Sequence, residues 1–355
     1  FAADSISIRS LDWDRSRFDI EFGLRNGTTY NSFIIKGKDI AVIDTSHSKF
    51  EKLWLESLIE QVNPNDIKYL ITSHTEPDHS GLISDLLELN SNITIVGSKI
   101  ALKFIEDQIH RPFNRLEVKS GEFLDLGINK NSGCQHNIEF ISAPNLHWPD
   151  TIFSFDHGTK VLYTCDAFGL HYCSNEFFDS NQKEIFKDFR FYYDCLMGPN
   201  ARSVVQAIKK IDKLPEVKII AVGHGPILQN HVNFWKDKYS EWSTNKSKGN
   251  EFVAVCYVSD YGYCDRLSQA LSHGITKADA QVQLIDLRSS DAQELTGLIS
   301  EAKAVVIPTW PIEYDPDLQE SIGTLFAALK PKQLTAIYDS FGGNDEPIDS
   351  LANKL

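Results

Sequence analysis

Hydrophobic and polar residues alternate with a period of two through the first part of the chain, between residues 5 and 45. This alternation is typical of antiparallel strands that bury one face, and glycine-containing turns separate the runs. It predicts strands over 6–8, 18–22, 32–35 and 40–44. The chain therefore begins with a sheet whose strands pair with their neighbours in sequence.

After residue 45 the hydrophobic period changes. Apolar residues recur at helical spacing over 49–61, 81–88, 99–108 and 201–210. Short apolar runs predict buried strands over 67–73, 94–97, 138–142, 161–165 and 219–222. Apolar strands separated by helices, with antiparallel signals at the start, predict a four-layered α/β sandwich whose functional site lies along one edge.

Length and composition favour two domains. The chain has 355 residues, of which 42% are hydrophobic, enough to bury two cores. A polar stretch at 241–251 predicts a linker. We therefore expect a first domain over 1–248 and a second over 252–355.

Charge and cysteine usage exclude several classes of partner. The net charge of −14 argues against nucleic acid and anionic membrane surfaces. The chain has no apolar run of about 18 residues that could span a bilayer, so any membrane association would be peripheral. The six cysteines form no CxxC pair, which favours reduced thiols and a cytoplasmic protein.

The densest group of metal-binding side chains directly follows the strand expected at 67–73. His74, Glu76, Asp78 and His79 stand within six residues. On an extended or turning backbone, positions 74, 76 and 78 point the same way, so one imidazole and two carboxylates would converge while His79 turns to the other side. That geometry suits two metal ions. The alternative is a polar loop in which Asp78 or Ser80 caps the next helix.

Three further candidates repeat the arrangement of a ligand after an apolar segment: His147, Asp166 and His224. Taken singly, each is more simply a loop histidine or a capping aspartate. Together with the motif they predict seven ligands from four strand ends. We interpret His171 as a neighbour of the site or a surface residue rather than a ligand. Cys165 is most simply a small buried apolar residue.

The second domain has three loops of its own. The buried strand 252–258 leads into a polar turn that opens an amphipathic helix, and the strands at 305–307 and 334–338 also end in loops. Open parallel sheets bind ligands at such strand ends. Hydroxyls and free N–H groups at a helix N-terminus can hold a phosphate monoester, although an ordinary capped helix gives the same pattern.

The metal-binding residues resemble the metallo-β-lactamase-like domain of the flavodiiron proteins. In the related zinc hydrolases the second motif position is normally histidine, where this chain has Glu76. A hard carboxylate oxygen in place of an imidazole moves the metal preference from zinc toward iron. The resemblance implies a pair of irons, with His74, Glu76 and His147 on one, Asp78, His79 and His224 on the other, and Asp166 bridging.

The second domain is similar to a flavodoxin that binds FMN on a doubly wound parallel sheet. The resemblance implies that the FMN phosphate lies on residues 259–264, and that the isoalloxazine ring lies between the other two loops, flanked by Trp310 and Phe341. The implied FMN residues are Ser259, Asp260, Tyr261, Gly262, Tyr263, Cys264, Pro308, Thr309, Trp310, Pro311, Ser340, Phe341, Gly342 and Gly343.

The stretches 257–263 and 339–347 resemble the flavodiiron proteins of oxygenic phototrophs, which usually continue into a flavin reductase domain. We expect an FMN domain that is incomplete at its C-terminus and lacks that reductase. The resemblance implies that FMN takes electrons from NAD(P)H or a reduced carrier, and that the di-iron site reduces dioxygen to water, as an electron sink in photoprotection. It also implies a head-to-tail homodimer, or a pair with a paralogue.

Three other functions remain open at this point. Nitric oxide reduction would use the same ligands. A metal-dependent hydrolase would direct a bound hydroxide at an ester or thioester. An electron carrier would use only the second domain, with the first as a scaffold.

Overall fold

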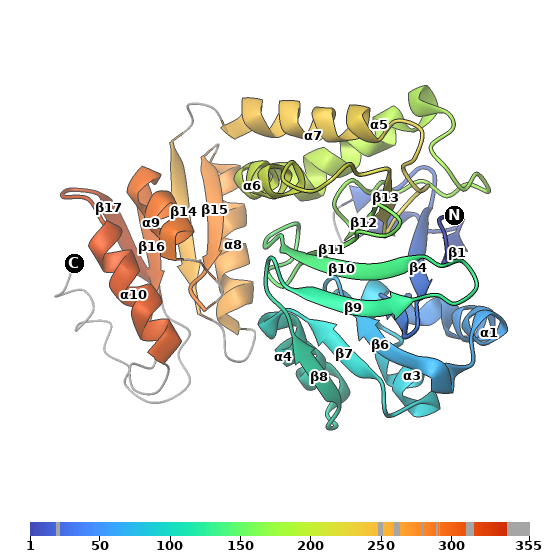
Figure 1. Ribbon diagram of the computed structural model, residues 1–355. Coiled ribbons are helices and arrows are strands. Elements are labelled where there is room, and N and C mark those ends of the chain that lie inside the picture. The colour runs from blue at the N-terminus through green and yellow to red at the C-terminus, as the bar shows by residue number, and fades with distance from the viewer. Residues whose placement is uncertain are drawn as a thin grey trace. The chain divides into compact units, whose positions relative to one another are not determined.

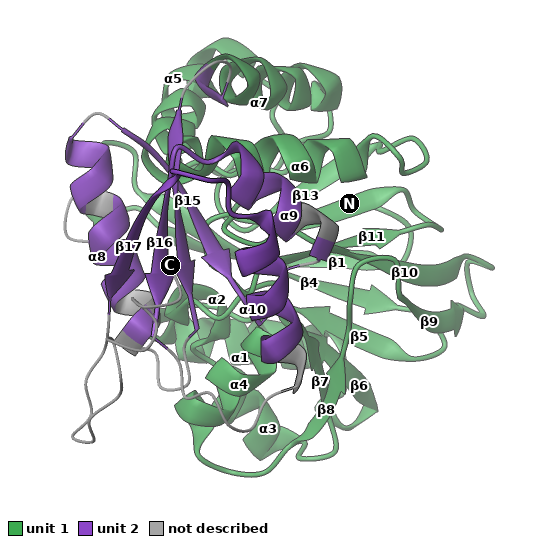
Figure 2. Cartoon of the chain, turned by 90° about the vertical axis from the view of Figure 1, so that its left-hand side faces the viewer, with its two compact units in different colours: residues 1–245 green, residues 246–355 purple. Residues whose placement is uncertain are grey.

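The computed structural model describes residues 1–18, 22–247, 251–258, 263–278, 280–288, 290, 292–309 and 316–338. The chain divides into two compact units, Phe1–Asn245 and Lys246–Leu355, which Figure 1 labels by element and Figure 2 colours separately. Within the described residues, no helix is both long enough and apolar enough to cross a membrane.

The first unit contains two mixed sheets. In spatial order the first consists of β1 (Ser5–Asp12), β4 (Thr28–Lys36), β5 (Ile40–Ile43), β6 (Ile67–Ile71), β7 (Thr94–Gly97) and β8 (Asn114–Glu117). The second consists of β13 (Ile219–Val222), β12 (Val161–Cys165), β11 (Ile152–Asp156), β10 (Gln135–Ser142) and β9 (Phe123–Ile128). In the first sheet, the β1–β4 and β4–β5 pairs are antiparallel and the pairs from β5 to β8 are parallel. The antiparallel start predicted from the period-two pattern is therefore present.

Helices cover the outer face of each sheet (Figure 1). The longer helices of this unit are α1 (Glu51–Gln61), α3 (Ile83–Leu89), α4 (Lys99–Ile109), α5 (Gln182–Tyr192), α6 (Ala201–Ile211) and α7 (Val232–Ser247), with a single turn, α2, at Pro77–Ser80. The first three long helices lie on the first sheet and the last three on the second. This arrangement confirms the four-layered sandwich.

The alternation along each strand explains the layers. In β4, Phe33 and Ile35 pack between the two sheets, while Ile34 packs against the helices of the outer layer. The same division separates Ile43 from Val42 in β5. Because successive strand residues point to opposite faces, one apolar strand contributes to two cores.

Several sequence predictions of elements need correction. The segment 18–22 is not one strand, since Arg17–Phe18 (β2) and Phe22–Gly23 (β3) form a short hairpin whose middle lies outside the described residues. The polar stretch 241–251 is helical through Ser247. It continues α7, whose Trp242 side chain is buried in the core of the first unit. The strands β8, β9 and β11 were not predicted at all. All four residues of β8 are exposed, so it carries no apolar pattern.

The second unit is a single parallel sheet with helices on both faces. Its strands, in spatial order, are β15 (Gln281–Asp286), β14 (Phe252–Tyr257), β16 (Ala304–Pro308) and β17 (Leu334–Tyr338). Figure 1 shows α8 (Tyr263–Lys277) on one side of this sheet and α9 (Ala292–Glu301) and α10 (Pro316–Ala328) on the other. The doubly wound fold is confirmed.

Candidate metal centre

The seven predicted metal ligands converge at one edge of the sandwich. His74 follows β6, Asp166 follows β12 and His224 follows β13, while His147 lies in the connection between β10 and β11. The remaining three are Glu76, Asp78 and His79, at the start of α2 and within it. Strand ends and a short helical turn are well-ordered backbone, which holds ligand side chains in place.

One half of the centre is formed around a single carboxylate oxygen of Asp166. The His147 Nε2 atom lies 2.9 Å from Glu76 Oε2 and 3.0 Å from Asp166 Oδ2. His74 Nε2 lies 3.4 Å from the same Glu76 oxygen and 3.6 Å from Asp166 Oδ2. Two imidazoles and two carboxylates therefore face one point.

The other half is formed around the second oxygen of Asp166. His79 Nε2 lies 2.9 Å from Asp166 Oδ1 and 3.2 Å from His224 Nε2. His224 Nε2 also lies 3.3 Å from Asp78 Oδ2 and 3.3 Å from Asp166 Oδ1. One carboxylate thus offers one oxygen to each of two ligand groups, which is the geometry of a bridging ligand between two metals.

The local backbone differs from the sequence prediction. Alternation along an extended chain would group Asp78 with His74 and Glu76, away from His79. Instead Pro77–Ser80 is the helical turn α2, so Asp78 and His79 both face His224. Pro77 is suited to the first helical position, where its missing N–H costs no hydrogen bond.

Burial without hydrogen-bond donors marks the centre as a cation site. His74, His79, Asp166 and His224 have no exposed surface. Among the described residues, the groups nearest to the Asp78 oxygens and to Asp166 Oδ1 are the imidazole nitrogens of His79 and His224, and no backbone N–H or hydroxyl donates to these oxygens. A buried carboxylate without a donor is costly unless a cation compensates its charge. The nitrogen and oxygen donors present fit a pair of iron ions.

The electrostatics of the centre point the same way. Burial acts to lower the pKa of His79, but Asp78 and Asp166 outweigh it and raise that pKa to about 10. Burial acts to raise the pKa of Asp166, but His79 and His224 hold it well below its usual range. The three carboxylates therefore create a strongly negative potential that attracts positive charge.

Residues that sequence reasoning missed hold the ligands in position. The His224 Nδ1–H donates to the Thr29 carbonyl oxygen over 2.6 Å, which leaves Nε2 free to face the centre. The backbone N–H and hydroxyl of Thr45 both donate to the His79 carbonyl, over 2.7 and 2.6 Å. Asp150 Oδ2 accepts from the Thr75 N–H and hydroxyl, over 2.9 and 2.7 Å. Only the position of Thr45 just after β5 repeats the strand-end signal.

Gly223, beside the ligand His224, is required by a close contact. A Cβ atom at this position would lie 2.7 Å from His79 Cε1 and 3.2 Å from the carbonyl carbon of Cys165. Carbon atoms do not approach so closely without displacement. The absence of a side chain at Gly223 therefore lets the His79 ring reach the centre.

His171 is buried beside the centre without joining either ligand group. Its Nδ1 atom lies 2.9 Å from the Thr28 hydroxyl, which lies 3.4 Å from His224 Nδ1. Burial and the neighbouring His224 lower the pKa of His171 well below its ordinary value, so the ring is neutral. Its interpretation as a non-ligand neighbour agrees with this position, and a surface position does not.

Cys165 is also buried at the centre, where its sulfur falls within 4.8 Å of ligand atoms of His74, His79 and Asp166. Burial and nearby carboxylates, Asp44 foremost, raise its pKa well above the ordinary value. The side chain is therefore a neutral thiol, consistent with a small buried residue.

The predicted FMN residues fall mostly on segments that are not described. Tyr263 and Cys264 begin α8, Pro308 ends β16, and the Thr309 N–H donates to the Tyr338 carbonyl over 2.9 Å. Because β14, β16 and β17 are parallel, their carboxyl ends share one edge of the sheet. The other predicted residues lie outside the described residues: Ser259, Asp260, Tyr261, Gly262, Trp310, Pro311, Ser340, Phe341, Gly342 and Gly343.

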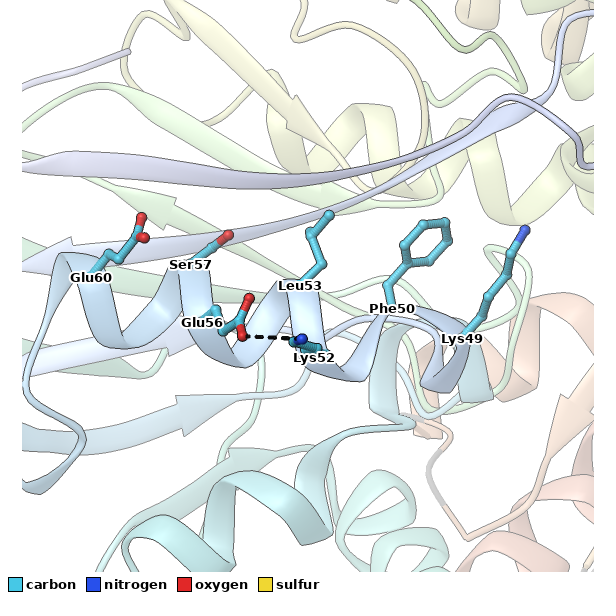
Figure 3. A pocket seen from close by; sticks show the side chains of 7 residues that line it. All are labelled: Lys49, Phe50, Lys52, Leu53, Glu56, Ser57 and Glu60. Carbon is cyan, nitrogen blue, oxygen red and sulfur yellow. Dashed lines mark ion pairs between the residues drawn. The ribbon is translucent and has the colours of Figure 1, made fainter.

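A hollow along α1 is separate from all of these residues (Figure 3). It has a volume of about 360 Å³. The Lys52 and Glu56 side chains, which both line it, form an ion pair of 3.9 Å. Its lining is Lys49, Phe50, Lys52, Leu53, Glu56, Ser57 and Glu60, none of which is a candidate ligand.

Comparisons with known proteins identify relatives of this chain. The family model described as "ODP family beta lactamase" matches residues 28–225. Diflavin flavoprotein A 1 of Synechocystis sp. (strain ATCC 27184) is 51% identical over 354 residues, which are 100% of this chain and 61% of that protein. The chain spans about three fifths of the length of the curated relatives it matches.

Two solved structures are similar to this chain over nearly its whole length. The metal-soaked Flv1 flavodiiron core from Synechocystis sp. PCC6803 has a TM-score of 0.74 at 31% identity, over 100% of this chain and 87% of that chain. Rubredoxin oxygen:oxidoreductase from the anaerobe Desulfovibrio gigas has a TM-score of 0.63 at 25% identity, over 99% of this chain and 88% of that chain.

Proposed function

Because the chain belongs to the flavodiiron proteins and to the ODP β-lactamase family, we propose that it is an oxidoreductase that reduces dioxygen to water at a di-iron centre, with electrons delivered through FMN. The observation that carries the proposal is the position of Asp166, whose two carboxylate oxygens face two separate ligand groups. Each dioxygen takes up four electrons and four protons to give two waters.

Seven residues of this chain would hold the irons. His74, Glu76 and His147 form one group, Asp78, His79 and His224 form the other, and Asp166 bridges them. Bound iron would supply redox chemistry at this position. Glu76 supports iron over zinc because a hard carboxylate stands where a zinc hydrolase has an imidazole.

The protein controls access and charge around this centre. The His147 side chain is 13% exposed and that of Glu76 11%, whereas those of His74, His79, Asp166 and His224 are fully buried. The Asp78 side chain is 6% exposed, so the most exposed ligands are Glu76 and His147, and we expect small molecules to approach the centre there. The buried His171 ring and the Thr28 hydroxyl pack beside the Nδ1 atom of His224, whose N–H donates to the Thr29 carbonyl.

The second unit would bind FMN at the carboxyl edge of its sheet, with the phosphate on residues 259–264 and the ring between the loops at 308–311 and 340–343. The parallel sheet and the helix that begins at Tyr263 support this placement. NAD(P)H would supply electrons through a reductase domain or a partner. A head-to-tail homodimer, or a pair with a paralogue, would bring one chain's flavin to the other's irons. A fully active monomer in sedimentation and turnover assays would refute that assembly.

The test is turnover of the iron-loaded, FMN-loaded chain with a chemical reductant under dioxygen and, separately, under nitric oxide. We expect dioxygen to be consumed faster, and Asp166→Asn to abolish turnover. Asp212→Asn is the matched control, since Asp212 pairs with Lys236 at the surface. Faster consumption of nitric oxide would reassign the gas. Ester hydrolysis by a zinc-loaded chain without gas reduction would reassign the reaction class.

A further inference from the structure

A second group of metal-binding side chains lies apart from the centre described above, between the N-terminal segment and the hairpin of β9 and β10. Its members are Asp4, Cys134 and His136, whose ligand atoms all lie within 4.8 Å of one another. We call these three residues the clip cluster. His136 is fully buried, and the Asp4 side chain is 15% exposed.

The clip cluster has the supporting carboxylate that protein metal sites use. The His136 Nδ1 atom lies 2.7 Å from Oδ2 of the fully buried Asp156. Asp156 also accepts from the Thr159 hydroxyl over 2.7 Å and the Gly158 N–H over 3.0 Å. An Asp156 carboxylate held in this way accepts the Nδ1 proton, so the neutral form of the ring would present its lone pair on Nε2.

That lone pair faces another acceptor. His136 Nε2 lies 3.4 Å from Asp4 Oδ2. Asp4 is itself held in place by the Ser132 hydroxyl, which also accepts from the Cys134 N–H over 3.0 Å. Against the effect of burial, Asp156 and Asp4 raise the pKa of His136, which favours a proton between Nε2 and Asp4 when no metal is bound. A divalent cation at the same position would replace that proton.

We propose that the clip cluster binds one zinc ion through Asp4 Oδ2, Cys134 Sγ and His136 Nε2, with water as the fourth ligand. Zinc takes mixed sulfur, nitrogen and oxygen ligands in tetrahedral geometry. Metal–nitrogen and metal–oxygen bonds of about 2.0–2.1 Å place two tetrahedral ligand atoms about 3.3 Å apart. The 3.4 Å between Nε2 and Oδ2 matches that separation.

The surrounding charge favours a metal. Burial, Asp156 and Asp4 raise the pKa of the Cys134 thiol, so without a cation the sulfur stays protonated. The same two carboxylates attract a divalent ion, which then displaces the thiol proton. The bound ion would connect residue 4 to the β9–β10 hairpin. It would stabilise the folded chain, and the stabilisation would increase as the free ion concentration rises above the dissociation constant.

Cobalt is the probe, because a thiolate ligand to Co²⁺ gives a charge-transfer band in the near ultraviolet that nitrogen and oxygen ligands do not. Co²⁺ is titrated into the reduced, iron-loaded full chain, into Cys134→Ser and into Asp4→Asn. Cys195→Ser is the matched control, since Cys195 is a half-buried free cysteine outside every ligand group. Zinc binding is measured by competition.

We expect one band-forming equivalent per chain, absent in Cys134→Ser, weakened at least tenfold in affinity in Asp4→Asn and unchanged in Cys195→Ser. Added zinc should remove the band and raise the melting temperature of the parent chain but not of Cys134→Ser. Absence of the band in the parent chain would overturn the proposal. Persistence of the band in Cys134→Ser would also overturn it, because another sulfur such as Cys165 would then be the ligand.

Discussion

The orientation of each histidine ring at the metal centre depends on what contacts the ring nitrogen that faces away from the centre. His224 is fixed because its Nδ1–H donates to the Thr29 carbonyl, whereas Nδ1 of His74 and of His79 has no partner. His79 is instead fixed by packing against Gly223 and by the two hydrogen bonds of Thr45 to its carbonyl oxygen. The orientation of the His79 ring is therefore sensitive to the volume of its neighbours, while hydrogen bonds hold its backbone.

Gly223→Ala tests this dependence. The added Cβ would collide with the His79 ring at 2.7 Å, so we expect the metal held by Asp78, His79 and His224 to bind at least tenfold more weakly. Metal titration of the variant measures this loss. Gly274→Ala, in α8, is the matched control because nothing lies within 4 Å of the added Cβ. It should leave metal affinity unchanged, and an equal loss in both variants would refute the steric explanation.

The sequence predicted which candidate ligands lie together but not the residues that support them. His74, Glu76 and Asp78 were recognisable because three metal-binding residue types stand at alternate positions after a predicted strand. Thr29, Thr45 and Asp150 are common polar residues whose roles depend on partners distant in sequence, such as Gly225 for Thr29. No local pattern distinguishes them from ordinary strand or loop residues.

The candidate ligands lie on short segments, and the hydrogen bonds that hold these segments determine how precisely the ligands are positioned. The loop between β6 and α2 is held by Asp150, which accepts the N–H and hydroxyl of Thr75 in a buried setting. That loop positions His74 and Glu76 on either side of Thr75. Removal of the Asp150 carboxylate should therefore weaken metal binding although no ligand is changed.

Asp150→Ala should weaken metal binding by about 10–100-fold, the range typical of groups that orient ligands. It also leaves the Thr75 N–H buried without an acceptor, at a cost to folding of about 1–3 kcal/mol. Metal affinity and urea unfolding of the metal-free chain measure the two effects separately. Unchanged metal affinity despite lost stability would show that Asp150 supports only the fold.

Helix α7 is anchored at its first turn by one buried carboxylate. Asp179 accepts from the backbone N–H groups of Gln229, Asn230 and His231, and from Trp235 Nε1 over 2.8 Å. This anchor and the buried Trp242 explain why the helix extends through a segment whose polar composition predicts a linker. Tertiary packing decided the structure there, which composition alone does not show.

Asp179→Ala should lower the free energy of unfolding by about 2–3 kcal/mol, because buried hydrogen bonds to a charged group are lost. Urea denaturation of the full chain measures this value. Metal affinity should stay within a factor of two of the parent chain, since Asp179 contacts no ligand. A large loss of metal affinity would mean that α7 positions the centre.

At the scale of the whole molecule, the layers of the fold were predictable from the sequence, whereas strands at the edges of the sheets, such as β8 and β15, were not. Strands such as β4 and β6 carry enough buried apolar residues to reveal both period and type. All four residues of β8 are exposed, so its sequence carries no apolar pattern. In the sheet of the second unit, β15 was also unpredicted, although its partner β14 was clear.

The two units should bind their cofactors independently within one chain. We expect Asp166→Asn to lose iron but to retain one FMN per chain, since every proposed FMN residue belongs to the second unit. Flavin absorbance after gel filtration measures retention. Loss of flavin together with iron would show that the FMN site depends on the first unit.

The most direct test of the di-iron assignment is metal content per chain, measured by inductively coupled plasma mass spectrometry on freshly purified protein, Asp166→Asn and Cys134→Ser. We predict two irons per parent chain, held by the two ligand groups on either side of Asp166, and their loss in Asp166→Asn alone. Zinc at the clip cluster should disappear only in Cys134→Ser. Zinc in place of iron that is lost in Asp166→Asn, or a single metal at this centre, would contradict the di-iron account.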